Sequence, residues 1–245
     1  MDVAVNVTVG VDRVGVIELD RPERRNALNV ETCGRIVAAA EELRAAAVRA
    51  VVVTGTGTSF CSGADFGEVY GEGFRDALHA ALGAVHSLPV PVVAAVNGPA
   101  IGAGTQLAIA CDLRVAAEGA VFALPTARLG LAVNPWTIRR LAQVAGGATA
   151  RALLLACDTV GAELALNRGL VDRLGTLEDA RALAAELAGL APLTLAYNKL
   201  VLDRVELGEE DPVLADAFEG CWRSADLEEG RTARSEKRVP AYEGR

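Results

Sequence analysis

The segment PVVAAVNGPAIGAG, residues 91–104, decides the fold. Residues 92–96 form a continuous run of apolar and β-branched side chains, which is typical of a strand buried on both faces. The glycine-rich turn that follows leads into an apolar stretch ending at Ala110, and this pattern predicts a helix. The first backbone N–H groups of a helix have no partner within it and lie at its positive end, so they can bind an oxyanion.

A second glycine turn, FCSGAD at residues 60–65, follows another buried β-branched run at 50–54. Either turn alone is also explained by glycines that permit a tight connection between strand and helix. Two turns in this order can instead aim two backbone N–H groups at one point, which is the arrangement of an oxyanion hole.

Outward from these turns, strands and helices alternate over the first half of the chain. The predicted elements there are a hairpin over 3–9 and 14–19, a loop over 21–29, helices over 30–48 and 74–87, and strands over 50–54, 92–96 and 113–116. From about residue 136 the pattern is almost wholly helical, and it ends in a polar tail after Leu227. This order predicts an α/β fold with a helical C-terminal part.

Composition excludes several classes of protein. The 245 residues are 51% apolar and 23% charged, which suits one folded domain and is incompatible with disorder. No run of about 18 apolar residues occurs, so we expect no membrane span, and the N-terminus lacks the basic and apolar segments of an export signal. Five scattered cysteines without C-x-x-C spacing suggest reduced thiols in the cytoplasm and no metal site. A net charge of −8 argues against nucleic-acid binding.

Six segments taken together resemble the crotonase superfamily, the enoyl-CoA hydratase/isomerase proteins. They are RPERRNALN (21–29), FCSGAD (60–65), PVVAAVNGPAIGAG (91–104), CDLRVA (111–116), ALNRGLVD (165–172) and EKRVPAYEGR (236–245). The resemblance implies a spiral of ββα units over 1–190 that contains an acyl-CoA site. It also implies a helical region with a tail over 191–245 that forms a homotrimer or a dimer of trimers. A coenzyme A thioester is the implied ligand, with no other cofactor.

The resemblance also implies which residues hold that ligand. The thioester carbonyl would accept hydrogen bonds from the backbone N–H groups of Ala64 and Ala103. Family members commonly have glycine at the position of Ala103, and alanine keeps the N–H while adding a methyl group. The implied substrate-binding residues are Arg24, Ala27, Ser62, Asp65, Phe66, Gly102, Gln106, Thr126, Asn134 and Trp136.

The acid and base of the hydratases are replaced in this chain. Those enzymes place one glutamate two residues past the second glycine turn and another after the proline of a later F-x-x-P-E segment; here the two positions read Gln106 and Thr126. Other members use an aspartate eight residues further on, which reads Asn134. An amide and a hydroxyl orient water but do not take its proton near pH 7. Each general acid or base contributes about 10²–10⁴-fold, so we expect weak or no hydratase activity.

Three nearby residues have both a structural and a functional interpretation. Asp65 orients the loop in the family, and its use as a base is the less favoured alternative. His79 lies where a relative of this fold has a histidine that activates a nucleophile, although a packing or surface role is favoured; with His86 seven residues on and no further ligands, it suggests no metal site. Trp136 either walls an apolar tunnel or packs in the core.

Coenzyme A is anionic, so an acidic chain needs local basic side chains to bind it. Arg24 lies in the loop that borders the nucleotide in this family, and its alternative is an ordinary exposed charged loop. Lys199, Lys237 and Arg238 are further candidates.

Three functions remain open from the sequence. The favoured one is a fatty acyl-CoA-binding protein of fatty acid metabolism with little or no turnover, working with other enzymes of that metabolism as partners. The second is an active hydratase or isomerase with an unidentified acid or base. The third is a thioester decarboxylase, which needs only the oxyanion hole because loss of CO₂ generates the carbanion.

Overall fold

The computed structural model describes residues 4–65, 67, 73–204 and 212–245 of the chain. Phe66, a predicted site residue, lies outside the described residues. The chain opens with the predicted hairpin, in which β1 (Val5–Val9) and β2 (Val14–Leu19) pair antiparallel. Four strands then add in parallel and give the order β1-β2-β3-β4-β6-β9: these are β3 (Ala50–Gly55), β4 (Val92–Val96), β6 (Leu113–Ala116) and β9 (Arg173–Leu174).

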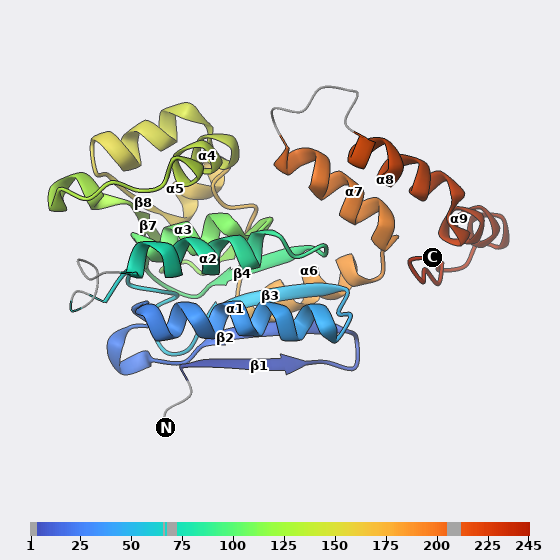
Figure 1. Cartoon of the computed structure of the whole chain (residues 1–245), viewed down its shortest axis with the longest axis horizontal. Coiled ribbons are helices and arrows are strands. Elements are labelled where there is room, and N and C mark those ends of the chain that lie inside the picture. The colour runs from blue at the N-terminus through green and yellow to red at the C-terminus, as the bar shows by residue number, and fades with distance from the viewer. Residues whose placement is uncertain (1–3, 66, 68–72, 205–211) are drawn as a thin grey trace.

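A second, smaller sheet lies beyond the first and has the order β5-β7-β8, with bounds Ala100–Ile101, Val121–Ala123 and Thr159–Gly161. Figure 1 shows this sheet near α4 and α5, and α7, α8 and α9 standing to one side of the spiral. The helices of the described residues are α1 (Val30–Ala45), α2 (Phe74–His86), α3 (Ala103–Ala110), α4 (Pro135–Leu155), α5 (Ala162–Asn167), α6 (Leu177–Ala188), α7 (Pro192–Asp203), α8 (Pro212–Arg223) and α9 (Ala225–Glu236), with 3-10 turns at Pro22–Arg24 and Pro125–Leu129. The predicted α/β class is confirmed. The small sheet and β9 were missed by the sequence prediction because their strands are only two or three residues long.

The central strands are buried on both faces, as their continuous apolar runs predict. Val51 and Val53 of β3 pack into a cluster with α1, α2 and α3, whereas Val52 between them packs into a second cluster with Leu183 of α6. Successive side chains of a strand point to opposite faces, so one apolar run supplies both clusters. The sheet is therefore sandwiched between helices on its two sides.

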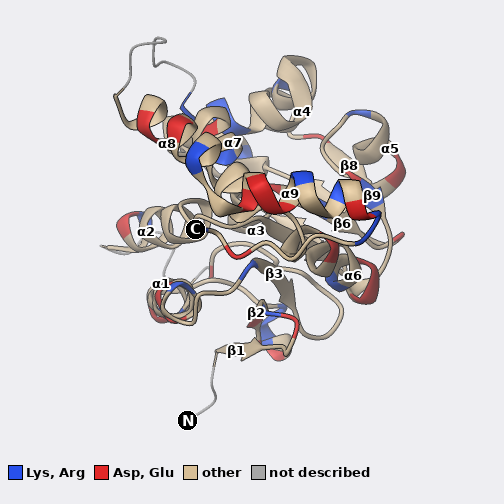
Figure 2. Cartoon of the chain, turned by 90° about the vertical axis from the view of Figure 1, so that its right-hand side faces the viewer, with Lys and Arg blue, Asp and Glu red and all other residues tan. Residues whose placement is uncertain are grey.

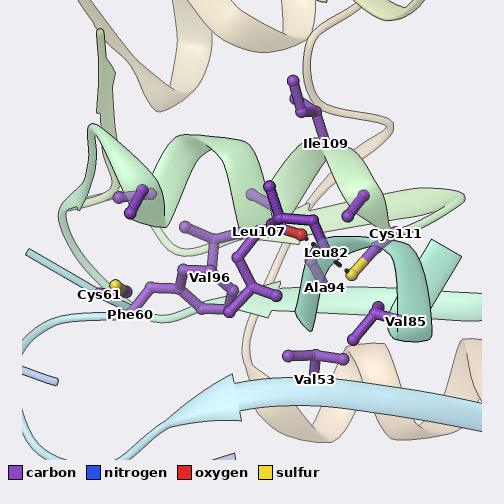
Figure 3. Close-up of a cluster of buried hydrophobic side chains, with 14 of the residues drawn as sticks. Val53, Phe60, Cys61, Leu82, Val85, Ala94, Val96, Leu107, Ile109 and Cys111 are labelled. Atoms are coloured by element: carbon purple, nitrogen blue, oxygen red, sulfur yellow. Dashed lines mark hydrogen bonds between the residues drawn. The ribbon is translucent and has the colours of Figure 1, made fainter. Parts of the chain in front are cut away.

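The larger cluster lies directly beneath the two glycine turns. In Figure 3, Phe60 and Cys61 lie at one end of this cluster and Cys111 at the other, with Leu82 and Leu107 between them. The Cys111 thiol donates to the carbonyl of Leu107 at 3.5 Å. Cys61 and Cys111 are both fully buried and fill space in this cluster as small apolar residues.

The chain does not end in a simple polar tail after Leu227, and that expectation is wrong. Ser224 caps α9 by accepting from the Leu227 amide, and the helix continues to Glu236 although most of its side chains are polar. The last residues then fold back: Glu243 and Gly244 donate through their amides to Asp226, which is 5% exposed. Hydrogen bonds thus order the C-terminus where apolar periodicity gave no signal.

The helices α7 and α8 contribute no fully buried residue. Large apolar side chains instead remain exposed on them, including Leu202 at 72%, Val213 at 53% and Trp222 at 61%. Among the described helices, none combines the length and the apolar character that a membrane crossing requires.

The close approach of the two glycine turns predicts the effect of one substitution. A Cβ on Gly104 would overlap the carbonyl oxygen of Cys61, so we expect Gly104→Ala to lower the free energy of unfolding by about 1–3 kcal/mol. Gly34 lies in α1 with open space around it, and Gly34→Ala should raise that free energy by about 0.5–1 kcal/mol. Urea unfolding of both variants measures the difference. An equally stable Gly104→Ala variant would contradict the packing.

Candidate functional site

Three loops leave the carboxyl ends of β2, β3 and β4 and run side by side. The amides of Leu28 and Asp65 bond to the carbonyls of Gly63 and Leu28 at 2.8 and 2.7 Å. The amides of Cys61 and Ile101 likewise bond to the carbonyls of Pro99 and Cys61 at 3.1 and 3.0 Å. Parallel pairing of the sheet thus continues as two isolated bridges, Leu28 with Ala64 and Cys61 with Ala100.

This pairing fixes the direction of the Ala64 amide. Leu28 bonds to the residues on either side of Ala64, so in a parallel bridge the N–H of Ala64 itself points away from Leu28. Ala103 is the first residue of α3, where an amide has no partner within the helix. Neither amide donates to a protein oxygen among the residues that the structure describes. Both residues line the same cavity.

Gly63 is the residue that lets these turns meet. Its φ is +116°, and a Cβ there would lie 3.0 Å from the carbonyl oxygen of Ile101. Only glycine combines this backbone conformation with so close an approach. Gly102, the residue before α3, also lines the cavity, and its own amide donates to the Ala123 carbonyl at 2.8 Å.

The cavity beneath the two turns has a volume of about 600 Å³. Most of its lining is apolar and comes from α2 and from the chain before α4: Phe74, Leu78, Leu82, Leu129, Leu131 and Val133. Exposed charged or ionisable side chains of α2 also contribute, namely Arg75, Asp76 and His79. From the sequence, an acyl carrier is expected to have an apolar pocket along the helix over 74–87, although its individual residues are not specified; the i, i+4, i+8 spacing of Phe74, Leu78 and Leu82 could have indicated them.

Three neutral polar side chains line the cavity with the two alanines: Gln106, Thr126 and Asn134. Gln106 is 6% exposed, and its Oε1 accepts from the hydroxyl of the fully buried Thr137 at 2.9 Å. Asn134 caps α4 by accepting from the Trp136 amide at 2.9 Å. The contact of Thr137 with Gln106 could not be predicted from the sequence, because it follows only from the packing of α4 against α3.

Other predicted site residues lie outside the cavity lining. Asp65 pairs with Arg21 at 3.6 Å and accepts from the Gly67 amide at 3.2 Å. Both contacts hold the loop. Trp136 packs its ring edge against His86, with ring centroids 5.2 Å apart. Ala27 is half-buried, and its carbonyl accepts from the Arg21 side chain at 2.6 Å.

The basic side chains proposed for coenzyme A differ in availability. Arg24 is exposed, and its carbonyl accepts from the hydroxyl of the cavity-lining Ser62 at 3.4 Å, so it adjoins the cavity. Lys199 bonds to Asp112 at 2.7 Å in a half-buried ion pair, and Arg238 pairs with Glu229. Lys237 is exposed at the end of α9. Figure 2 shows positive and negative residues interspersed on α8 and α9.

No cluster of three side chains able to hold a metal ion occurs in the described ranges. Cys61 lies within the first turn, and the complete burial of its thiol raises its pKa to about 12. This thiol therefore stays protonated near neutral pH and is a poor nucleophile.

The spiral of two sheets, with a cavity beneath two glycine turns, defines a crotonase-type fold. A crystal structure of an enoyl-CoA hydratase from Bacillus anthracis matches with a TM-score of 0.90 and 29% identity, covering 99% of this chain and 100% of that one. An enoyl-CoA hydratase/isomerase family structure from Hyphomonas neptunium matches at 0.92 with 30% identity, covering 100% and 99%.

Sequence comparison reaches the same class of protein. The family model for enoyl-CoA hydratase/isomerase matches residues 11–245. The Mycobacterium tuberculosis protein named "Probable enoyl-CoA hydratase echA6" is 46% identical over 235 residues, which cover 95% of this chain and 97% of that protein. This chain therefore belongs to the enoyl-CoA hydratase/isomerase family, as its motifs predicted.

The burial of two thiols predicts how the cysteines react. Burial raises the pKa of both Cys61 and Cys111 to about 12, so in the folded protein at pH 8 neither should be alkylated by iodoacetamide within an hour. Alkylation after unfolding in urea is the control, and peptide mass spectrometry locates the label. Rapid labelling of Cys61 in the folded protein would contradict its burial.

Proposed function

We propose that this protein binds fatty acyl-CoA thioesters and hydrates enoyl-CoA weakly or not at all. The thioester oxygen accepts from the amides of Ala64 and Ala103; in support, both residues line one cavity, and neither amide has a protein partner among the described residues. The alkyl chain lies along Phe74, Leu78 and Leu82. Arg24, exposed beside the cavity, binds a phosphate of coenzyme A.

The expected low activity rests on one observation: Gln106 and Thr126 both line the cavity. By their motifs, these two positions correspond to the two glutamates of the hydratases. Neither side chain can accept a proton from water near pH 7. The amides of the hole remain, so the site retains binding and polarisation of the thioester. A carrier or sensor of acyl thioesters in fatty acid metabolism needs no more than that.

The alternative of an active hydratase rests on two side chains. Asp76 and His79 are ionisable and line the cavity from α2. They project from the wall that carries the apolar residues, whereas Gln106 and Ala103 share α3. A base on α2 would therefore act from a different side of the acyl group than the family's glutamates.

Binding and turnover measured on one sample test the proposal. Titration of hexadecanoyl-CoA by calorimetry should give a Kd of about 1 µM, or about −8 kcal/mol. Loss of the enoyl absorbance of crotonyl-CoA and of a longer enoyl-CoA should not exceed background. Rapid hydration would overturn the proposal, and its loss in Asp76→Asn or His79→Gln would identify the base.

Restoring the missing carboxylates provides a second test. The double variant Gln106→Glu, Thr126→Glu should gain crotonyl-CoA hydration of about 10²-fold or more, since a positioned acid or base contributes at least that factor. Gln106→Leu, Thr126→Val is the matched control and should show no gain. The same absorbance assay measures both. A double glutamate variant that binds hexadecanoyl-CoA normally but stays inactive would show that other parts of the catalytic geometry are missing.

We further propose that the protein is a homotrimer, or a dimer of trimers, assembled through its C-terminal helices. Phe218 and Trp222 lie one turn apart on α8 and remain 42% and 61% exposed. Apolar side chains clustered on a projecting helix pair are typical of a surface that another subunit covers. Light scattering after gel filtration should give the mass of three or six chains.

Trp222→Glu should shift that mass toward the monomer, because a charge would be buried at the contact. Val11→Glu, at an exposed apolar residue in the β1–β2 turn, is the control and should leave the mass unchanged. An unchanged mass in the Trp222 variant would remove α8 from the interface.

A further inference from the structure

The side-chain amide of Asn134 has a fixed orientation. Its Oδ1 accepts from the backbone amide of Trp136 at 2.9 Å, and a backbone amide can only donate. The oxygen of Asn134 must therefore face Trp136, which leaves Nδ2 with two donor hydrogens. Because Asn134 lines the cavity, those donors are available to a ligand there.

Gln106 is oriented in the same sense. The Thr137 hydroxyl donates to its Oε1 at 2.9 Å, and both residues are buried. The Nε2 group of Gln106 has no hydrogen-bond partner among the described residues. It is nevertheless not a fully buried atom, because the one fully buried side-chain polar atom without a partner in those residues is Asn97 Oδ1. Nε2 therefore reaches open space, and the space that Gln106 lines is the cavity.

The polar end of the cavity consequently presents four N–H donors: the backbone amides of Ala64 and Ala103 and the side-chain amides of Gln106 and Asn134. A simple acyl thioester brings one strong acceptor, its carbonyl oxygen, and two backbone amides suffice for it. A saturated or enoyl chain has no oxygen for the other two donors, and at the buried Gln106 it displaces the water that would satisfy the amide, whereas the exposed Asn134 can remain hydrated. Leaving a donor unsatisfied on binding weakens affinity by about 1–3 kcal/mol.

The placement of the second donor pair indicates where another oxygen would lie. Gln106 follows Ala103 by three residues on α3, and helical side chains lean back over the preceding turn toward the helix N-terminus, so the Gln106 side chain extends toward the turn that holds the Ala103 N–H. The second oxygen of the ligand therefore lies only a few bonds from the thioester carbonyl. Oxygens on carbons 1 and 3 of an acyl chain have this relation.

We infer that the cavity selects 1,3-dicarbonyl thioesters, with the oxygen on carbon 3 accepting from Gln106 Nε2 and Asn134 Nδ2, and with Thr137 as the residue that positions Gln106. This inference rests on the proposed binding of acyl thioesters. Two ligand types share the chemistry: 3-oxoacyl thioesters and malonyl-type thioesters, whose carboxylate carbon is carbon 3. The apolar wall of Phe74, Leu78 and Leu82 favours the 3-oxoacyl type, because it has an alkyl chain to bury.

Calorimetry on the full-length protein tests the selection with three ligands: hexadecanoyl-CoA, 3-oxohexadecanoyl-CoA and malonyl-CoA. The 3-oxo ligand should bind about tenfold tighter than the saturated one, the factor that about one net hydrogen bond provides. Equal affinity for these two would overturn the inference and leave the proposed function intact. Failure of all three to bind would overturn the proposed function itself. Tighter binding of malonyl-CoA than of both long-chain ligands would overturn the choice of the 3-oxoacyl type.

Variants separate positioning from general stability. Thr137→Val keeps the shape of the side chain but removes the donor that orients Gln106, so the preference for the 3-oxo ligand should fall several-fold while affinity for hexadecanoyl-CoA stays constant. Thr149→Val alters another buried threonine of α4 that does not line the cavity, and it should change neither affinity. An unchanged preference in Thr137→Val would overturn the role of Thr137.

Gln106→Glu provides a second variant should Thr137→Val fail to fold. It replaces the amide donor by a carboxylate that repels an acceptor oxygen, so the preference for the 3-oxo ligand should be lost or reversed. The near-ultraviolet absorbance of the enolate, which forms when carbon 2 of the 3-oxo ligand loses a proton to the buffer, gives an independent readout, because donors at both oxygens stabilise that anion. The absorbance should rise when the wild-type protein binds the 3-oxo ligand and should rise less in either variant. A 3-oxo preference that survives in Gln106→Glu would overturn the inference.

Discussion

Backbone pairing between three loops is the constraint on which the site depends. The parallel strands β2, β3 and β4 end together, and the bridges between Leu28 and Ala64 and between Cys61 and Ala100 continue their pairing into the loops. These bonds determine which way the Ala64 amide points, and Ala103 at the start of α3 lines the same cavity. Because this geometry is made by main-chain atoms, it does not depend on which side chains stand at Gln106 and Thr126.

Much of this arrangement could be predicted from the sequence, and the reason is physical. The β-branched runs of β3 and β4 have to be buried on both faces, and a glycine turn after each leaves few alternatives to a strand followed by a turn. Short elements gave no such signal. The strands β5, β7, β8 and β9 are two or three residues long, and α9 is held by its Ser224 cap and the folded-back C-terminus rather than by an apolar stripe.

The site was only partly predictable for a related reason. Ser62, Ala64, Gly102, Ala103, Gln106, Thr126 and Asn134 all line the cavity, because each follows from a motif that the chain retains. Trp136 packs against His86 instead, and the contribution of Thr137 to Gln106 depends on how α4 lies against α3. Contacts between distant helices leave no trace in local periodicity. The roles of these residues in binding remain predictions from the motifs and the cavity.

The cavity divides into two parts that can vary independently. The bridged loops provide the backbone amides at one part of the cavity, whereas the segment from the 3-10 turn at Pro125–Leu129 through the first turn of α4 provides both apolar side chains and the polar Thr126 and Asn134. Within that segment, Asn134 caps α4 and Thr137 orients Gln106, so one helical turn determines the direction of both side-chain amides. A carboxylate at position 106 would bring negative charge into a mostly apolar cavity, and burying that charge is costly. The amide of Gln106 is neutral, and the hydrogen bond from Thr137 fixes its oxygen so that its N–H group faces away from Thr137. The residue at position 106 and its contact with α4 therefore determine whether this part of the cavity carries a charge or neutral N–H donors.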